Sequence, residues 1–315
     1  MKTFFKNSVF FLLGLLIISF IIQSIVFALI KNLEVGELGV INKIMNGQIN
    51  TEILICGASR AFVGINPKII EEYSGMSCYN IALNGSRLGL QVPLLKAYLK
   101  HNKKPKILIQ ELGMYSLSVD KKVFAPYKFL PYLQESEIYE GLLKIDHRIW
   151  LNKFIPLMNL TYFNTNFQSI LIKDYKRQLN KLGDYLIDGF HKNKNQWSID
   201  EKGFFKNPHG IYNKIEHKGI QLLDEIIQIC KENNIKLVLV NTPEYYKILN
   251  LYKHRDEIIK VFENKAKEND LKYLDYTEHE MTKNRNNFYN FTHLNARGAN
   301  KFTNILCKNF INNKN

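Results

Sequence analysis

Cysteine is scarce in this sequence, and the four cysteines that occur lie too far apart in the chain to suggest a shared site. Cys56, Cys78, Cys230 and Cys307 include no CxxC pair and no spacing typical of metal ligands. The first two fall in expected buried strands and the other two in expected helices, where a thiol behaves as a small hydrophobic side chain. The sequence therefore predicts neither a disulfide framework nor a metal site, and nothing in it calls for a cofactor.

Glycine-rich phosphate motifs are also missing. No expected strand is followed by GxGxxG or GxxxxGK, which argues against the common nucleotide-binding loops. The net charge of +14 would suit an anionic partner, but the lysines are scattered among asparagines and isoleucines. Because zinc fingers, basic helices and RNA-binding aromatic signatures are absent as well, we expect no nucleic-acid partner. An apolar content of 46% rules out a disordered chain.

One long apolar run stands near the start of the chain. Ser8 to Ile30 has the length of a membrane span, and its polar interruptions are serines and one glutamine. No good cleavage site follows, so a signal anchor is favoured over a cleaved signal peptide. Lys2 and Lys6, in the short segment 1–7, place the amino terminus in the cytoplasm and the remainder of this single-pass protein outside. Residues 31–50 contain glycines and few apolar side chains, which predicts a short stalk.

After this segment, apolar strands alternate with amphipathic helices. The expected strands are Ile53–Cys56, Cys78–Leu83, Lys106–Leu112, Lys236–Thr242 and Lys272–Tyr276. The expected helices are Pro67–Tyr73, Gln91–Lys100, Glu216–Asn233, Lys253–Asn269 and Ala299–Phe310. This order predicts an α/β domain, made of residues 51–112 and 214–315, in which helices cover a right-handed parallel sheet.

Residues 113–213 interrupt the alternation after the third strand. This segment is rich in aromatic residues, and its expected helices are short and irregular. The aromatic rings either pack into a small core of their own or form a sugar-binding wall. Because the segment leaves the sheet at the edge where ligands bind, it is expected to be a lid or a substrate-binding insertion.

Polar residues follow three of the expected strands. Ser59 comes after the first strand in GASR, Asn84 and Gly85 come after the second, and His293 comes after the fifth, before a helix that Asn295 can cap. The carboxyl ends of parallel strands meet at one edge, where ligands bind. A serine hydroxyl becomes a nucleophile when an imidazole removes its proton and N–H groups stabilise the oxyanion. The alternative interpretation is that Ser59 and His293 are only turn or cap residues.

These motifs resemble those of the SGNH/GDSL hydrolase superfamily. The resemblance rests on GASR, YNIALNGS and NFTHLNARG and covers about residues 51–112 and 214–315. With the amino-terminal anchor, the chain looks most like the bacterial cell-surface branch with alginate-acetylation-like and lipoteichoic-acid D-alanylation-like proteins. The resemblance implies a flavodoxin-like α/β/α fold with a five-stranded sheet of order 2-1-3-4-5. It also implies Ser59 as nucleophile, Gly85 as an oxyanion donor and His293 as general base.

Two positions depart from the family pattern. Met114 and Tyr115 stand where the family has a Gly-x-Asn that completes the oxyanion hole, so one donor is missing unless Tyr115 or Asn84 replaces it. Asn290 stands where the family has the aspartate that orients the histidine, and an amide can also accept the imidazole N–H. Glu111 and Asp275, at strand ends, are alternative acids. Arg60, next to Ser59, joins Asn84 and Tyr115 as a candidate for oxyanion or substrate binding.

These expectations combine into a membrane-anchored acyl esterase or O-acyltransferase that acts on a cell-envelope polysaccharide or another acylated glycan. The partners are then the glycan, the lipid bilayer through residues 8–30 and a membrane-bound acyltransferase. The rival hypothesis is a non-catalytic protein of the same fold, which binds glycan or serves as a scaffold in a polysaccharide modification system. The absence of the asparagine and the aspartate of the family pattern favours the non-catalytic hypothesis. The order of the motifs along the chain favours the enzyme hypothesis.

Overall fold

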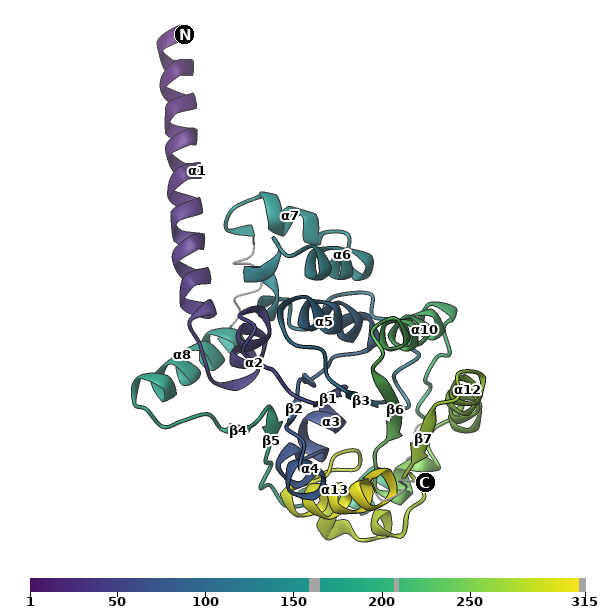
Figure 1. Cartoon of the computed structure of the whole chain (residues 1–315). Helices are drawn as coiled ribbons and strands as arrows, with labels where there is room; N and C mark the ends of the chain where they lie inside the picture. The colour runs from purple at the N-terminus through teal and green to yellow at the C-terminus, as the bar shows by residue number, and fades with distance from the viewer. Residues whose placement is uncertain (159–164, 207–209, 312–315) are drawn as a thin grey trace.

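The computed structural model describes residues 1–158, 165–206 and 210–311. Its centre is a five-stranded parallel sheet in the order β2-β1-β3-β6-β7, which is the predicted order of the five main strands (Figure 1). The strands are β1 (Ile53–Cys56), β2 (Cys78–Asn80), β3 (Ile107–Glu111), β6 (Lys236–Asn241) and β7 (Lys272–Asp275). The three central strands are almost entirely buried, since helices cover both faces of the sheet. The predicted fold class is confirmed.

Two layers of helices enclose the sheet. Helices α3, α4 and α13 pack together on one face, and α5 and α10 pack together on the other (Figure 1). Their bounds, with those of α12 beside β7, are α3 (Ser59–Gly64), α4 (Pro67–Ser74), α5 (Leu88–His101), α10 (His217–Glu232), α12 (Arg255–Glu268) and α13 (Ala296–Ile311). The cap predicted at Asn295 is present, because its Oδ1 accepts the Gly298 N–H at 3.0 Å.

Strand β2 ends earlier than expected, at Asn80 instead of Leu83. Asn80 is fully buried, and its Oδ1 accepts the Ala82 N–H at 3.0 Å, in a local turn that ends the regular strand. Its amide nitrogen donates to the carbonyls of Ala61 and Ile65 at 2.9 and 3.1 Å. These two carbonyls lie in the last turn of α3 and at the residue just after it, where carbonyls lack a full set of partners within the helix. Asn80 therefore helps to hold α3 against the sheet.

Residues 31–50 differ from the expected stalk. Helix α1 (Lys2–Lys31) is followed almost directly by α2 (Gly36–Met45), and Val40, Ile41 and Ile44 on α2 are fully buried in the main core. Five of the ten residues of α2 are apolar and all five are buried, so this segment packs against the domain instead of forming a stalk.

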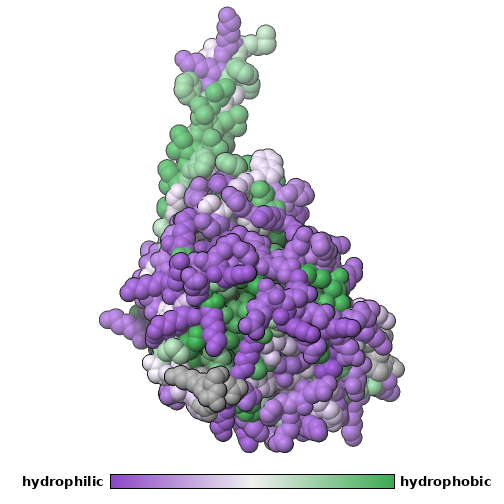
Figure 2. Space-filling view, turned by 45° about the vertical axis from the view of Figure 1, so that its right-hand side comes forward, coloured by the Kyte–Doolittle hydropathy of each residue, from purple (hydrophilic) through white to green (hydrophobic). Residues whose placement is uncertain are grey.

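The joint between α1 and α2 is fixed by a buried asparagine. The Asn42 amide nitrogen donates to the carbonyls of Ile30 and Leu33, both at 2.7 Å, and its Oδ1 accepts the Tyr132 hydroxyl at 2.6 Å. Beyond this joint α1 stands away from the body with its apolar side chains exposed (Figures 1 and 2). Among the described residues, α1 is the one helix that is long and apolar enough to cross a membrane.

The expected insertion is spread over the molecule, and its residues 159–164 and 207–209 lie outside the described residues. Its elements are η1 (Pro126–Lys128), η2 (Leu130–Tyr132), α6 (Ser136–Ile145), α7 (Ile149–Phe154), α8 (Thr165–Leu179), β4 (Leu186–Ile187), β5 (Phe190–His191) and α9 (Glu201–Lys206). Helix α6 packs on α5, so this part covers a helix layer and not the edge of the sheet. Phe124 and the stretch from Asn193 to Trp197 contact the loops that carry Gly85 and His293, as described below, and β5 packs on α3.

Candidate active site

The turn between β1 and α3 presents Ser59 at the carboxyl end of the sheet. Glycine is needed at position 57, because a Cβ there would lie 2.7 Å from the Cβ of Glu111 and 2.8 Å from that of Ala61. The Ala58 N–H donates to Oε2 of Glu111 at 3.1 Å, which ties the turn to the end of β3. Ser59 is then the first residue of α3, and its side chain is partly exposed.

His293 reaches Ser59 from the loop that precedes α13. Its Nε2 lies 2.8 Å from the Ser59 Oγ, across a sequence separation of 234 residues. On the other side of the ring, Nδ1 lies 3.0 Å from the Oδ1 of Asn290. The three residues expected to act together are thus in hydrogen-bonding contact.

The surroundings of Asn290 determine which ring nitrogen of His293 carries the proton. The backbone N–H groups of Thr292 and His293 both donate to Asn290 Oδ1, at 3.0 and 2.9 Å, so this atom is the amide oxygen and can only accept. Nδ1 therefore donates its proton to Asn290. Nε2 is left with a lone pair that faces the Ser59 hydroxyl, which is the arrangement that a general base requires.

Two neighbours of His293 that the sequence analysis did not single out also hold the ring. The Thr292 Oγ1 lies 2.8 Å from Nδ1, and the ring of Tyr289 stacks on the imidazole at 5.5 Å between centroids and 20° between planes. Tyr289 in turn bonds to the side chain of Asn193, in the insertion. Both residues belong to the FYNFTHLN motif, but a sequence pattern does not show which side of a loop each side chain faces.

Burial, and to a smaller extent the nearby positive charge of Arg60, lower the pKa of His293 to about 4. Burial removes water that stabilises the charged imidazolium more than the neutral imidazole, so the neutral form is favoured. At neutral pH the ring is therefore neutral and ready to accept a proton. As a base, however, it is weaker than an ordinary histidine.

Arg60 differs from its expected role in substrate or oxyanion binding, because its guanidinium turns away from Ser59 into a buried polar cluster. Its Nε donates to Thr242 Oγ1 at 2.9 Å, and its Nη2 bonds to the Oδ1 of Asn241 at 2.8 Å and to the carbonyl of Thr242. Ion pairs join it to Glu111 at 3.7 Å and to Glu244 at 3.3 Å. Arg60 thus connects α3 to the ends of β3 and β6.

Neither alternative acid has a described contact with His293. Glu111 is 2% exposed and bonds to the Ala58 N–H and Arg60, and burial raises the pKa of its carboxyl group. Asp275 lies at the exposed end of β7, where it accepts the N–H and the hydroxyl of Thr277 at 2.8 and 2.7 Å. The geometry therefore gives Glu111 a role in shaping the turn that carries Ser59, and Asp275 a role in a surface turn.

The loop after β2 brings Gly85 to the same edge. The Leu83 N–H donates to the carbonyl of Gly57 at 3.4 Å, two residues before Ser59 in the chain. Gly85 has a φ of +69° and lies so close to the ring of Phe124 that a Cβ would come within 2.3 Å of it. The Asn84 N–H donates to Glu37 of α2 at 3.0 Å. The expected stalk and insertion therefore both contribute to holding this loop.

The position of the missing family asparagine contains no replacement amide. Met114 is fully buried, whereas Tyr115 is 44% exposed. The described ring contacts of Tyr115 are with Tyr252, edge-on at 6.4 Å, and with Arg87, 6.0 Å above its ring. Tyr115 lies at the rim of the edge, and among the described contacts its hydroxyl makes no bond to Ser59 or His293.

A polar groove of about 730 Å³ begins at the amino end of α13, close to His293. It is lined by Asn193–Trp197, Arg285, Asn286 and Asn295–Arg297. Trp197 packs edge-on against Phe291 at 5.0 Å between centroids, and the Asn193 carbonyl accepts the Ala296 N–H at 2.6 Å. These contacts join one part of the insertion to the loop that carries the histidine.

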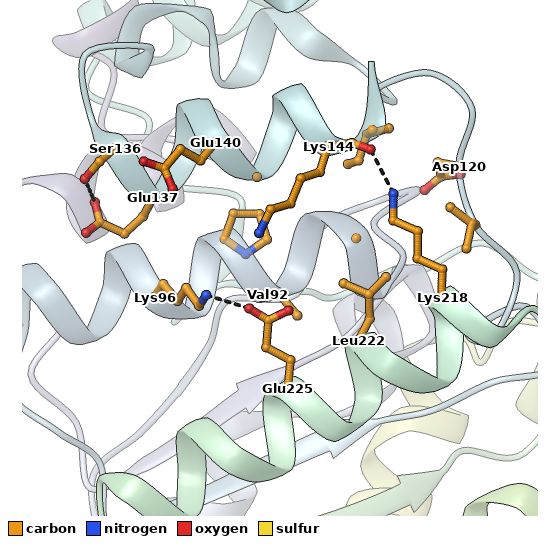
Figure 3. A pocket seen from close by; sticks show the side chains of 15 residues that line it. Val92, Lys96, Asp120, Ser136, Glu137, Glu140, Lys144, Lys218, Leu222 and Glu225 are labelled. Atoms are coloured by element: carbon orange, nitrogen blue, oxygen red, sulfur yellow. Dashed lines mark hydrogen bonds and ion pairs between the residues drawn. The ribbon is translucent and has the colours of Figure 1, made fainter. Parts of the chain in front are cut away.

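A second cavity, of about 230 Å³, lies between α5, α6 and α10 (Figure 3). Two of its lysines already have partners within the cavity. Lys96 forms an ion pair with Glu225 at 2.5 Å, and Lys218 donates to the backbone carbonyl of Lys144 at 2.9 Å. None of its lining residues belongs to the edge where Ser59 lies. It is also smaller than most ligand sites, which measure about 300–1,000 Å³. This cavity is therefore not part of the candidate active site.

Comparisons with known proteins found distant structural likenesses. A protein-family model matches residues 193–315, less than half of the chain. No curated protein matches. Among solved structures, a protein of Desulfitobacterium hafniense DCB-2 assigned to the G-D-S-L family of lipolytic proteins is similar, with 12% identity, a TM-score of 0.42, and coverage of 82% of this chain and 99% of that one. A Bacteroides fragilis NCTC 9343 protein assigned as an acylhydrolase has 8% identity, a TM-score of 0.37, and coverage of 82% and 86%. At these values the likeness carries no argument about chemistry.

Proposed function

We propose that the chain is a serine acyl esterase or O-acyltransferase of the SGNH/GDSL type, anchored in the cell membrane and acting on envelope polysaccharide outside it. The observation that carries the proposal is the hydrogen-bonded series from the Ser59 hydroxyl to His293 Nε2 at 2.8 Å and from His293 Nδ1 to Asn290 at 3.0 Å. A serine, an imidazole and an acceptor in this order are the parts of nucleophilic acyl transfer.

Acylation follows from this geometry. The Ser59 Oγ attacks the carbonyl carbon of the ester while its proton moves to Nε2 of His293. Asn290 holds the Nδ1 proton and keeps the ring in place, but as a neutral amide it stabilises the resulting imidazolium less than a carboxylate would. When the tetrahedral intermediate collapses, His293 gives its proton to the departing sugar hydroxyl, and an acyl group remains on Ser59.

The second half of the reaction decides between the two activities. His293 removes a proton from the incoming hydroxyl, which then attacks the acyl-serine and releases Ser59. Water as the acceptor gives hydrolysis, and a second sugar hydroxyl gives acyl transfer. Because His293 has a pKa near 4, it is a weak base, and we expect it to activate water slowly. A sugar hydroxyl that is bound beside the ring would react faster, because binding fixes its position relative to the acyl-serine.

The proposed oxyanion donors are backbone N–H groups. Ser59 is in the first turn of α3, where an N–H has no acceptor within the helix. The Gly85 N–H is the second, on a loop that Gly57 and Asn84 hold near the nucleophile. Removing one side-chain donor from an oxyanion hole costs about 2.7–4 kcal/mol in serine proteases. The absence of the family asparagine therefore also predicts modest hydrolytic rates.

A glycan substrate is supported by the groove beside His293. Its lining combines amide side chains, the tryptophan at position 197 and the cationic side chains of Lys194, Arg285 and Arg297. Sugar hydroxyls bond to amides and pack on aromatic rings, and the cations suit an acidic or phosphate-bearing polymer. The exposed apolar surface of α1 supports anchoring in the membrane, with the domain outside because Lys2 and Lys6 precede the span.

The simplest test is hydrolysis of p-nitrophenyl acetate by the full chain in detergent. We expect slow turnover that Ser59→Ala removes, because no other hydroxyl is bonded to His293 Nε2 among the described contacts. Circular dichroism of the variant should match that of the parent. Turnover that is unchanged in Ser59→Ala would reject the catalytic role, and no turnover in either protein, with acetylated glycans also tried, would favour the scaffold hypothesis.

The pH profile gives an independent prediction. Since the pKa of His293 is lowered to about 4, kcat/KM should stay level as the pH falls through 6.5 and should decline only near pH 4. The unfolded chain binds this proton at about the ordinary value of 6.5, so the free energy of unfolding should decrease as the pH falls from 6.5 toward 4. Half-loss of kcat/KM near pH 6.5 would show that the ring is not buried in the working enzyme.

A further inference from the structure

Helix α1 has an exposed part and a part that packs on the domain. Val26, Phe27 and Ile30 pack in a cluster with Leu33 and Leu38, and Tyr127, Leu171 and Tyr175 complete this cluster from the body of the protein. Before Val26, the apolar side chains of α1 are exposed. Ser8 to Phe27 extends for about 30 Å at ~1.5 Å per residue, which matches the hydrocarbon core of a bilayer. The membrane surface on the side of the domain therefore lies about one turn of α1 beyond Gln23.

One segment of the body meets α1 at this level. The backbone N–H of Leu157 donates to Oε1 of Gln23 at 2.8 Å, so the chain just after α7 is fixed against the helix where it leaves the membrane. Figure 1 shows α7 at the end of the body from which α1 projects, beside the lower part of α1. In Figure 2 the apolar surface of α1 continues onto apolar and weakly polar residues at this end of the body.

The same segment has an apolar outer side with exposed large side chains. Ile149 and Asn152 of α7 are buried against the body. The other large side chains face outward: Trp150, Phe154, Ile155 and Met158 are 47%, 62%, 42% and 37% exposed. Isolated apolar residues are common on surfaces, but here they fall within nine consecutive positions and adjoin the proposed span.

Lipid is the partner that fits this position. Tryptophan is enriched where the headgroups meet the acyl chains, because its ring is apolar and its N–H can remain hydrated. Lys153 lies in the same segment, 3.8 Å above the ring of Tyr139, where its charge can reach anionic headgroups. A glycan or a soluble protein would have to compete for this surface with the bilayer that α1 already brings against it.

We propose that residues 150–158 form a second membrane-contacting element, which inserts Trp150, Phe154, Ile155 and Met158 into the headgroup boundary of the leaflet where α1 emerges. The inference rests on the anchoring by α1 proposed above and is independent of ester hydrolysis. Short apolar elements of this kind enter the boundary by about 5–10 Å. With α1 they give the domain two points of attachment, which define one orientation relative to the membrane.

The chain's two tryptophans allow a direct test with a matched control. The full-length Trp197→Phe variant, in which Trp150 alone remains, is reconstituted into phosphatidylcholine–phosphatidylglycerol vesicles with bromine at defined acyl carbons. We expect blue-shifted emission that is quenched most strongly by bromines near the headgroup. Trp150→Phe, which keeps Trp197 at the groove near His293, should show little quenching in the same vesicles.

The possible outcomes test the second membrane contact separately from anchoring by α1. Retention on the vesicles with Trp150 unquenched and emitting as in water would overturn the second contact and leave the anchor intact. Blue-shifted emission without bromine quenching would overturn it too, because protein from another copy would then cover Trp150. Loss of the protein from the vesicles after a carbonate wash would overturn both proposals.

Discussion

His293→Ala should lower kcat for p-nitrophenyl acetate by about ten-thousandfold or more, while Asn290→Asp should preserve or raise it. Without the imidazole, nothing bonded to the Ser59 hydroxyl can remove its proton. Aspartate at 290 keeps an acceptor for the Nδ1 proton and for the N–H groups of Thr292 and His293, and it adds a charge that stabilises the imidazolium. The measurement is steady-state kcat for both variants, with the fold checked by thermal unfolding.

Two carboxylate variants serve as controls. Glu111→Gln can still accept the Ala58 N–H, and Asp275→Asn alters only a surface turn, so neither should approach the defect of His293→Ala. If either change is as damaging as His293→Ala in a folded protein, that acid is the third catalytic member and the role given to Asn290 is wrong. A large loss in Asn290→Asp alone would mean that the neutral amide is needed, for example to keep the histidine pKa low.

Arg60→Met should lower the free energy of unfolding by about 3–5 kcal/mol at neutral pH. Arg60 is the cation that lies between two buried carboxylates, Glu111 and Glu244, which are 2% and 1% exposed. Removing it leaves both without a counter-charge in the interior, where an unpaired charge is costly. Lys106→Met, which breaks an exposed ion pair with Glu52, is the control and should cost at most about 1 kcal/mol.

The pH dependence identifies the cause of this destabilisation. Burial already raises the carboxyl pKa of Glu111 and of Glu244, and losing Arg60 raises both further. A folded state with raised carboxyl pKa values binds more protons than the unfolded chain, so the contribution of these two groups to stability is greatest at low pH and falls as the pH rises. The deficit of Arg60→Met should therefore shrink on acidification. A deficit that is equal at all pH values would point to lost packing instead.

Activity provides a second readout of the same variant. The charge of Arg60 contributes to the low pKa of His293, after burial. Without it, the acid limb of kcat/KM should move to higher pH, toward the ordinary histidine value. An unmoved limb would show that burial alone sets the pKa.

The strand pattern and the positions of Ser59 and His293 at one edge of the sheet could be predicted from the sequence, because each depends on local signals. β1 is an uninterrupted apolar run bounded by Gly57, and its predicted limits match the structure at both ends. Ser59 and His293 each follow a strand at the carboxyl edge, and the topology of parallel sheets brings such residues together from distant positions. The spacing from Asn290 to His293 suits a tight turn, which is what the structure contains.

Other features depend on contacts that no local pattern records. The side chain of Arg60 is long enough to face either the substrate or the interior, and the carboxylates that draw it inward lie more than fifty residues away in the chain. Asn80 looked like an ordinary strand residue, and its bonds to α3 appear only after α3 has folded back on the sheet. In the same way, half of the residues of α2 are apolar, but the elements that bury it, α5 and η1, lie far away in the chain.

For the proposed membrane-anchored enzyme, the joint between α1 and α2 also constrains where the reaction can occur. A flexible stalk would let the domain search a volume set by the length of the tether, whereas here Asn42 binds the carbonyls of Ile30, at the end of α1, and of Leu33, just after it, and leaves little freedom to bend. With α1 across the membrane, the distance from the bilayer to Ser59 becomes a constant of the fold. The domain can then diffuse in the plane of the membrane and rotate about the α1 axis, but its distance from the membrane stays fixed. Polymer strands would be modified at one depth of the envelope, as they pass that depth during their export or growth.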